Sequence, residues 1–420
     1  MSVLTWINIA LGGLLVLCYA YQFVFVLIAY LTKRPKFEAK KINKIAVLIA
    51  ARNEENVIGG LISSLKAQDY PKEALEVFVI ADNCTDKTAE AARAAGAIAY
   101  ERFNKVEVGK GYAVDFLLKR IAEEYGDSFF DAYLIFDADN LVEPDFVTEI
   151  NKTFSQGYDC VTSYRNSKNY GDNWLSAGQG MCFMRDLILL NRARMKIGGC
   201  CFVAGTGFMF SSALCRSFGG GWPFHTLTED GEFTTYNAIK GNKMGYCDTA
   251  RFYDDQPTKF TQSWNQRLRW CKGYLQIIKG YYSKLIPGIF SRRFLSCFDM
   301  AMCMAPAYIL PLLTIFANLI GAPISIFAAG VPWQQVAISL GVGVAGAYLA
   351  LFFFGFLLTI SEWKQIRASA FKKLLYMFTF PVYMFTFIPI AFVALLKRDV
   401  KWTPIVHENK VTMEDLNAKK

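Results

Sequence analysis

Three short polar clusters carry the chemistry that this chain of 420 residues is equipped to perform. They are, in chain order, residues 137–139 (Asp-Ala-Asp), 228–230 (Thr-Glu-Asp) and 266–270 (Gln-Arg-Leu-Arg-Trp). Carboxylate oxygens are the ligands that Mg²⁺ and Mn²⁺ prefer, and such a cation commonly bridges a carboxylate to a phosphate. A further carboxylate can accept a proton from a nucleophile, and arginine binds phosphate bidentately. The clusters therefore predict a metal-bound nucleotide, a proton acceptor and a basic, aromatic platform.

Alternating strands and helices are expected to position these clusters. Short apolar runs predict strands at 44–50, 75–81, 96–100 and 132–136, and helical periodicity predicts helices at 57–67, 86–95 and 110–125. Strands that alternate with helices indicate βαβ units, so we expect an α/β fold with a mostly parallel sheet flanked by helices. The domain is expected to span residues 44–280.

Polar residues follow three of these strands, at the edge where ligands of parallel sheets collect. Arg52 and Glu54 follow the first strand, Asp82 the second and Asp137 the fourth. A single Asp or Asn at such a place is often only a turn or helix-cap residue, but three such sites in succession favour ligand binding. No glycine fingerprint for a dinucleotide follows the first strand, so a nucleoside diphosphate held by carboxylates fits better.

Apolar segments flank the predicted domain. The chain is 53% hydrophobic and 15% aromatic, with a mean hydropathy of +0.23, which is high for a soluble protein. Residues 5–31 carry no charge and are long enough to cross a bilayer, and Lys33, Arg34 and Lys36 follow them. A signal peptide would want a basic start instead, so a retained transmembrane helix is expected. Further apolar stretches lie at 297–319, 334–360 and 374–396.

Loop charges predict a multi-pass protein of the plasma membrane with a cytoplasmic catalytic domain. Residues 361–373 contain four basic side chains, whereas residues 320–333 carry no charge. We expect an interfacial segment at 281–296, a transmembrane or re-entrant region at 297–396 and a cytoplasmic tail at 397–420. A third C-terminal crossing would place the basic tail outside, but Pro381 and Pro389 could break that segment so that it returns. Both courses stay open.

Composition and missing motifs exclude several functions. The formal net charge of +9 is concentrated near the predicted membrane boundaries, and no helix-turn-helix, zinc or RNA-binding pattern accompanies it, so no nucleic-acid partner is expected. Eleven cysteines without paired spacing are typical of reduced core residues. The two histidines and the absence of a G-x-S-x-G motif disfavour serine hydrolases.

The order of the motifs resembles the processive, membrane-embedded family 2 glycosyltransferases, which include the cellulose, chitin and hyaluronan synthases. Gln266, Arg269 and Trp270 match the QxxRW signature of that family, and Asp137 with Asp139 match its DxD motif. The resemblance covers residues 44 to about 280 and extends to the membrane region only in outline. It implies a GT-A-type fold.

The resemblance also implies roles for individual residues. Nucleotide-sugar contacts are implied at Arg52, Glu54, Asp82, Asp137, Gln266, Arg269 and Trp270; metal binding at Asp139; catalysis at Glu229 and Asp230; acceptor contacts at Phe202, Gly205, Thr206 and Trp270. Asp230 would be the base that deprotonates the attacking hydroxyl, and Thr228 is a candidate helix cap. Lys110 lies between two glycines and would either reach a phosphate or remain solvated. Residues 401–405 resemble a tail that gates the nucleotide site in some synthases.

The function implied is inverting, Mg²⁺- or Mn²⁺-dependent polymerisation of a UDP-sugar into an extracellular polysaccharide. The expected partners are the UDP-sugar donor, the growing polysaccharide and the lipid bilayer, and homo-oligomers or accessory export proteins are left open. A transferase that adds one sugar to a lipid is the alternative. A receptor or transporter with an inactive transferase domain is disfavoured, because all the carboxylates are present.

Overall fold

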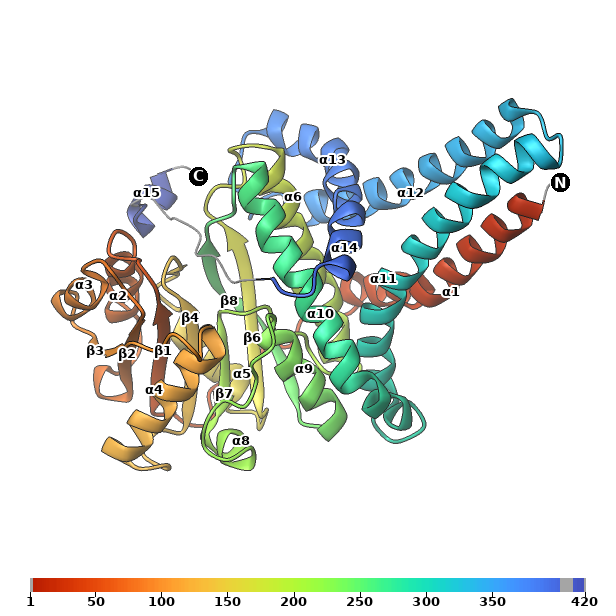
Figure 1. The fold of residues 1–420 in the computed structure, drawn as a ribbon. Helices are drawn as coiled ribbons and strands as arrows, with labels where there is room; N and C mark the ends of the chain where they lie inside the picture. Colours follow the sequence, from red (N-terminus) through yellow and green to blue (C-terminus); the bar gives the residue numbers. More distant parts are fainter. Residues whose placement is uncertain (1–2, 401–410, 419–420) are drawn as a thin grey trace.

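The computed structural model describes residues 3–400 and 411–418, and an α/β unit with one mixed sheet forms its centre (Figure 1). The strands are β1 (Ile45–Ala51), β2 (Leu75–Asp82), β3 (Ile98–Arg102), β4 (Ala132–Asp137), β5 (Leu141–Val142), β6 (Cys160–Ser167), β7 (Phe208–Ser211) and β8 (Met244–Asp254). Their order in the sheet is β3-β2-β1-β4-β7-β6-β8-β5. The predicted α/β fold with flanking helices is confirmed.

The first four strands in the sheet order are parallel, as predicted, and the remainder of the sheet is mixed. β1 pairs in parallel with β2 and β4, and β2 pairs in parallel with β3. β7 runs antiparallel to both β4 and β6. The carboxyl ends of β1, β2, β3 and β4 therefore meet at one edge, which brings together the polar residues that follow them.

Helices cover both faces of the sheet. They are α2 (Ile58–Lys66), α3 (Thr88–Ala94), α4 (Lys110–Tyr125), α5 (Phe146–Phe154), α6 (Trp174–Phe183), α7 (Asn191–Lys196), α8 (Ser212–Ser217), α9 (Glu229–Lys240) and α10 (Phe260–Ile289), with a 3₁₀ turn η1 (Lys72–Ala74) and a π-helix η2 (Met184–Leu190). Residues of α4 and α9 form one buried apolar cluster with the sheet, and residues of α2 and α5 form the other. The strands read as continuous apolar runs because both faces are covered.

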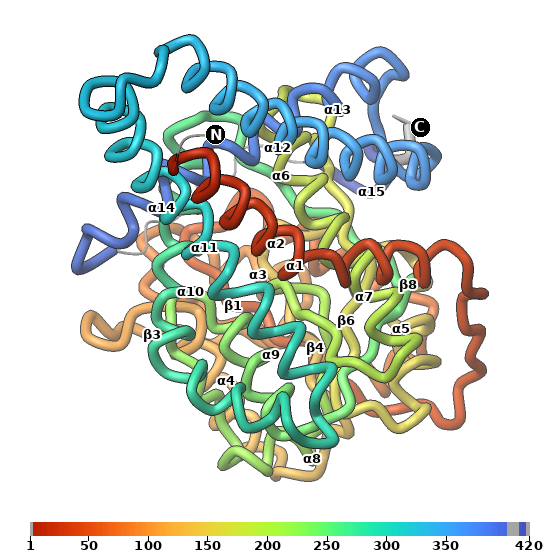
Figure 2. The backbone as a smooth tube through the Cα atoms, turned by 90° about the vertical axis from the view of Figure 1, so that its right-hand side faces the viewer, coloured from red at the N-terminus to blue at the C-terminus, as the bar shows by residue number. Residues whose placement is uncertain are grey.

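Within residues 3–400 and 411–418, four helical segments are long and apolar enough to cross a membrane. They are α1 (Val3–Leu31), α11 (Phe294–Pro323) with the π-helix η3 (Ile324–Ala328), α12 (Trp333–Ser361), and α13 (Ala370–Phe385) with α14 (Phe387–Leu396). α1, α11 and α12 leave the α/β unit side by side (Figure 1). In Figure 2 the start of α1 and the connection between α11 and α12 lie at the same corner of the molecule. The side-chain amides of Asn8 and Asn318 join α1 to α11 there, at 2.8 Å.

α13 and α14 take a different course, along the α/β unit. The Lys372 ammonium group donates to the carbonyl of Gly171 (2.5 Å), and Lys272 of α10 donates to the carbonyl of Ala394 (3.3 Å). Both ends of the segment therefore contact the α/β unit. The helix α15 (Met413–Ala418) also lies against that unit, because Leu416 packs in a cluster with Leu141 and Tyr253.

Candidate active site

One large cavity extends from the carboxyl ends of the parallel strands to the three helices α1, α11 and α12, which project from the α/β unit. Its volume is about 1710 Å³. Thirteen of the fourteen predicted site residues line it: Arg52, Glu54, Asp82, Lys110, Asp137, Asp139, Phe202, Gly205, Glu229, Asp230, Gln266, Arg269 and Trp270. The structure thus brings the three sequence clusters to one site, although 126 residues separate the first cluster from the last.

A crowded group of carboxylates forms the strand-edge part of the cavity. Burial and the negative charges of Asp139 and Asp137 raise the pKa of Glu54 to about 9, and the Oε2 atom of Glu54 has no hydrogen-bond partner. The Asp255 backbone N–H donates to Oδ2 of Asp139 at 3.2 Å. So much negative charge in a small volume, with an unpartnered buried oxygen, fits a divalent cation. No group of three or more His, Cys, Asp or Glu side chains among the described residues is already arranged as a metal site, and Mg²⁺ typically takes most of its ligands from substrate phosphates and water.

Lys110, the first residue of α4, connects the strand edge to the loop before β7. Its ammonium group forms an ion pair with Asp137 and donates to the carbonyl of Gly205 at 2.6 Å. Its side chain is only 18% exposed, so the solvated alternative is wrong. Lys110 lies where a diphosphate that approaches Asp137 would meet a positive charge.

The two predicted catalytic carboxylates lie in the first turn of α9. Burial and the charge of Asp230 raise the pKa of Glu229 to about 7. Burial also raises the pKa of Asp230, against the opposing effect of Lys110 and Arg269. Arg269 holds the chain just before the helix, because its Nη1 donates to the carbonyl of Leu227 at 2.6 Å. Thr228 occupies the N-cap position of α9, as expected, but its hydroxyl has no hydrogen-bond partner among the described residues and so makes no side-chain cap.

We expect transfer activity to be lost on the acid side at an unusually high pH. A base works only when deprotonated, so activity is present above its raised pKa and disappears as the pH falls through it. Because burial raises the pKa of Asp230, the acid limb of kcat/KM should lie above the ordinary carboxylate range. The measurement is kcat/KM against pH, with donor binding followed in parallel. A limb near pH ~4, the usual range of Glu and Asp, would contradict the expectation.

Gly205 leaves open space beside the proposed base. Its φ of +77° is a left-handed conformation that glycine adopts readily, and a Cβ added there would stand 3.5 Å from Oδ2 of Asp230. Thr206 was predicted to contact the acceptor, but its side chain is buried outside the cavity lining. Its hydroxyl accepts from the backbone N–H of Asp137 (2.9 Å) and donates to Asn140, so it holds the end of β4 in place.

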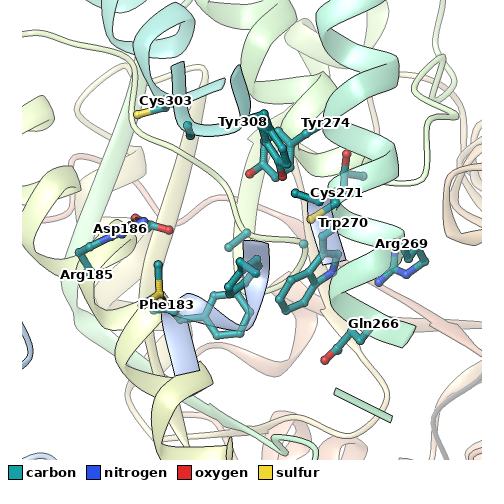
Figure 3. A pocket seen from close by; sticks show the side chains of 18 of the residues that line it. Phe183, Arg185, Asp186, Gln266, Arg269, Trp270, Cys271, Tyr274, Cys303 and Tyr308 are labelled. Atoms are coloured by element: carbon teal, nitrogen blue, oxygen red, sulfur yellow. Dashed lines mark hydrogen bonds and ion pairs between the residues drawn. The ribbon is translucent and has the colours of Figure 1, made fainter. Parts of the chain in front are cut away.

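The predicted platform lies on α10, and its residues Gln266, Arg269 and Trp270, labelled in Figure 3, line the cavity. Gln266 accepts a hydrogen bond from the side chain of Gln179 at 2.8 Å. The Trp270 ring meets the edge of the Phe183 ring with 5.7 Å between the ring centroids. Both residues line the cavity, and such rings provide flat surfaces for a sugar.

Close approach of α10 to the catalytic turn depends on Gly273. A Cβ at this position would overlap the hydroxyl of Thr228 and lie 2.7 Å from its backbone nitrogen. We expect Gly273→Ala to lower activity strongly and to destabilise the fold by about 1–3 kcal/mol through overpacking. Gly280→Ala on the same helix meets no atom within 4 Å and should stabilise by about 0.5–1 kcal/mol. Thermal unfolding and transfer assays on both variants check this, and equal behaviour of the two would contradict it.

Several cavity residues escaped prediction from the sequence. Arg185 and Asp186 form an ion pair at 2.8 Å on the π-helix η2, and Tyr274 and Tyr308 lie across the cavity from them (Figure 3). The signal available in the sequence for Arg185 and Asp186 was that they are the charged residues of the otherwise uncharged run 174–190. A π-helix within a longer helix frequently occurs at a functional site.

A second acidic doublet at a strand end was also missed. Asp254 is the last residue of β8 and Asp255 follows it, and both line the cavity. Asp137 has the same position at the end of β4. Burial raises the pKa of Asp254 to about 6, although Arg165 opposes this with an ion pair and a 2.8 Å bond from Nε. Two aspartates at the end of a strand are the same kind of signal as Asp137 and Asp139, which were recognised.

A mixed α/β sheet with carboxylates and a buried base candidate at its edge defines a glycosyltransferase of the GT-A type. Residues 43–273 match the model of the family described as "Glycosyltransferase like family 2", and the chain belongs to that family. The predicted enzyme class is thereby confirmed. The narrower prediction, membership of the processive synthases, is not established by this match.

Two of the similar proteins differ in the products that their names state. A beta-monoglucosyldiacylglycerol synthase of Nostoc sp. is 28% identical over 289 residues, which is 66% of this chain and 59% of the relative. A poly-beta-1,6-N-acetyl-D-glucosamine synthase of Staphylococcus aureus is 22% identical over 59% of this chain and 58% of the relative. The chain thus spans about three fifths of the length of these relatives.

A solved structure supports the fold over nearly the whole chain. It is the mannosyltransferase PcManGT of Pyrobaculum calidifontis in complex with GDP-Man and Mn²⁺, with a TM-score of 0.59 and 17% identity. The match covers 94% of this chain and 99% of that structure. At this identity the likeness concerns the fold alone.

Proposed function

We propose that this enzyme transfers one sugar, with inversion, from a UDP-sugar to a hydroxyl group of a membrane lipid. The observation that carries the proposal is the continuity of the cavity from Asp230 into the space between α1, α11 and α12. A lipid whose chain lies among these helices would present its head group to the base without leaving the bilayer. The UDP moiety follows from the resemblance at Asp82 and Asp137.

The residues support a direct displacement. The carboxylate of Asp230 removes the proton of the acceptor hydroxyl, whose oxygen then bonds to the anomeric carbon while the bond from that carbon to the diphosphate oxygen breaks. Lys110 contributes positive charge beside the leaving diphosphate. Asp139, with Asp137 nearby, would hold Mg²⁺ or Mn²⁺, which neutralises the charge of the leaving group when bound.

The membrane placement follows from the helices and the loop charges. We infer that α1, α11 and α12 cross the plasma membrane, and that the α/β unit lies in the cytoplasm beside Lys33 and the basic loop 361–373. α13 and α14 return to the α/β unit at both ends, so they lie along the membrane surface in this arrangement. The tail is then cytoplasmic, which agrees with the basic residues at 397 and 398. The proposed gating residues 401–405 lie outside the described residues.

Polymer synthesis is the second candidate, and Trp270 with Phe183 favours it. Aromatic rings facing a cavity are suited to holding successive sugars, and one of the relatives bears the name of a polysaccharide synthase. The cavity between the projecting helices, however, is lined mainly by apolar and small side chains such as Leu15, Leu340 and Ala347. A polysaccharide would lose its hydrogen bonds to water there with few replacements.

Product analysis separates the candidates. The full chain, reconstituted in vesicles that contain dioleoylglycerol, is supplied with Mn²⁺ or Mg²⁺ and with UDP-glucose, UDP-N-acetylglucosamine or GDP-mannose. The proposal expects a single-sugar glycolipid from a UDP-sugar. A ladder of sugars would support polymer synthesis, and transfer from GDP-mannose alone would overturn the assignment of the donor.

A further inference from the structure

The three projecting helices pack against one another at their ends and stand apart in between. The buried residues of α12 are Val336 at its start and three residues between 355 and 359 near its end, with none between. α1 shows the same pattern, with Leu4 buried at its start and Gln22, Phe25 and Val26 buried toward its end. The cavity described above continues into this central space.

We call the part of the cavity between α1, α11 and α12 the groove, and most of its lining side chains are apolar. It is lined by residues of one face of each helix, among them Gly12, Leu15, Val16, Gly343, Val344 and Ala347. Glycine and alanine leave room that larger side chains would fill. Nothing lies within 4 Å of a Cβ built on Gly12 or Gly343, which confirms that the space beside them is open.

The far end of the groove is closed. Asn8 and Asn318 line it and hydrogen-bond to each other, and beyond them a Cβ on Gly321 would stand 2.6 Å from Cδ1 of Leu4. A polar pair within membrane helices normally faces a partner rather than lipid, and here it marks where the groove stops. The groove thus ends at this contact between α1 and α11, and in the other direction it is continuous with the part of the cavity that holds the catalytic carboxylates.

The length of the groove indicates what fills it. Its lining on α12 runs from Ser339 to Phe354, which is about 22 Å at 1.5 Å per residue. Half of the hydrocarbon core of a bilayer measures only ~15 Å. A chain that fills the groove from the cytoplasmic side therefore reaches past the bilayer midplane.

We propose that the groove binds one long hydrocarbon chain of the acceptor lipid, and that Gly12 and Gly343 set its capacity. This inference rests on the proposed lipid acceptor and adds the place of its chain. The chain enters beneath Tyr274 and Tyr308 and ends at Asn8 and Asn318, so that its head group stays at the level of Trp270 and Asp230. Its length then contributes to the choice of acceptor.

Two matched pairs of glycine substitutions test the proposal. Gly343→Leu and Gly12→Leu place a side chain in the groove, whereas Gly346→Leu and Gly13→Leu add the same side chain on the same helices outside its lining. Filling an occupied site typically costs enough to lower kcat/KM by about ten- to a hundredfold. We expect that loss for dioleoylglycerol with the two groove variants, less than about twofold change for dihexanoylglycerol, and little effect from the control pair.

A second measurement tests lipid binding in the groove separately from the proposed transfer activity. Native mass spectrometry of the purified full chain reports whether membrane lipid stays bound, and the groove variants should retain less of it than the control pair. Equal retention by all four variants, or equal loss of activity with both glycerides, would overturn the groove assignment. Failure of the unsubstituted enzyme to glycosylate either glyceride would instead overturn the acceptor, while the retention result still decides the groove.

Discussion

Asp230→Asn is expected to lower sugar transfer by about 10²–10⁴-fold while donor binding remains. The amide keeps the size and hydrogen-bonding outline of the side chain, but it cannot accept the proton of the acceptor hydroxyl. Because Asp230 belongs to α9 and is not one of the carboxylates at the strand ends, the nucleotide should still bind. The measurements are initial rates of glycolipid formation and calorimetric titration with UDP in the presence of Mn²⁺.

Glu232→Gln provides the matched control for that substitution. Glu232 lies in the same first turn of α9 but outside the cavity lining, and it accepts hydrogen bonds from the Thr226 backbone N–H (2.9 Å) and the Tyr281 hydroxyl (2.9 Å). Glutamine retains an acceptor for one of these bonds, so only a several-fold loss is expected. If both variants lost activity equally, the charge of the helix turn rather than the base would explain the effect. Transfer by Asp230→Asn at the normal rate would remove Asp230 from the catalytic role.

Asp139→Asn is expected to lower transfer by about a hundredfold or more and to abolish the effect of Mn²⁺ on UDP affinity. The loss of one carboxylate charge removes several kcal/mol of stabilisation for the cation and the leaving diphosphate. The pKa of Glu54 should fall at the same time, because the charge of Asp139 is one of the causes that raise it. UDP titrations with Mn²⁺ and with a chelator, on the wild type and the variant, measure the coupling between cation and nucleotide.

The control for this second substitution is Asp145→Asn. Asp145 is exposed, follows β5 and lies outside the cavity, so its loss should leave both rate and cation dependence unchanged. A variant Asp139→Asn whose UDP affinity still rises with Mn²⁺ as in the wild type would show that the cation is held elsewhere in the cavity. Asp254 and Asp255 would then be the next residues to substitute.

The elements of the α/β unit and the chemistry at its edge were predictable from local sequence. The predicted strands and helices between residues 44 and 136 agree with the structure to within about two residues, because apolar runs and helical periods are local properties. The carboxyl ends of parallel strands must meet, so Glu54, Asp82 and Asp137 were expected near one another before any coordinates. The family model that matches residues 43–273 agrees with this part of the chain.

The surroundings of that edge depend instead on packing between segments that are distant in the chain. Thr206 turned inward because its hydroxyl is used by Asp137 and Asn140, a partnership between segments 66 residues apart in sequence. The course of α13 and α14 depends on contacts such as that of the Tyr383 side chain with Gly178 on α6, where a Cβ would stand 2.7 Å from Cβ of Tyr383. No local period encodes such contacts, since they depend on side-chain shape at two distant places at once.

The continuity of the cavity also depends on contacts between segments that are distant in the chain. Hydropathy marked α1, α11 and α12 as apolar helices but said nothing about the space between them. That space exists because α1 and α11 touch at Leu4 and Gly321 and again near the α/β unit. Between these contacts, small residues such as Gly12 and Gly343 line the space without filling it. The residues' chemistry was thus fixed by local sequence, and the path that leads a lipid to them was fixed by packing between helices far apart in the chain.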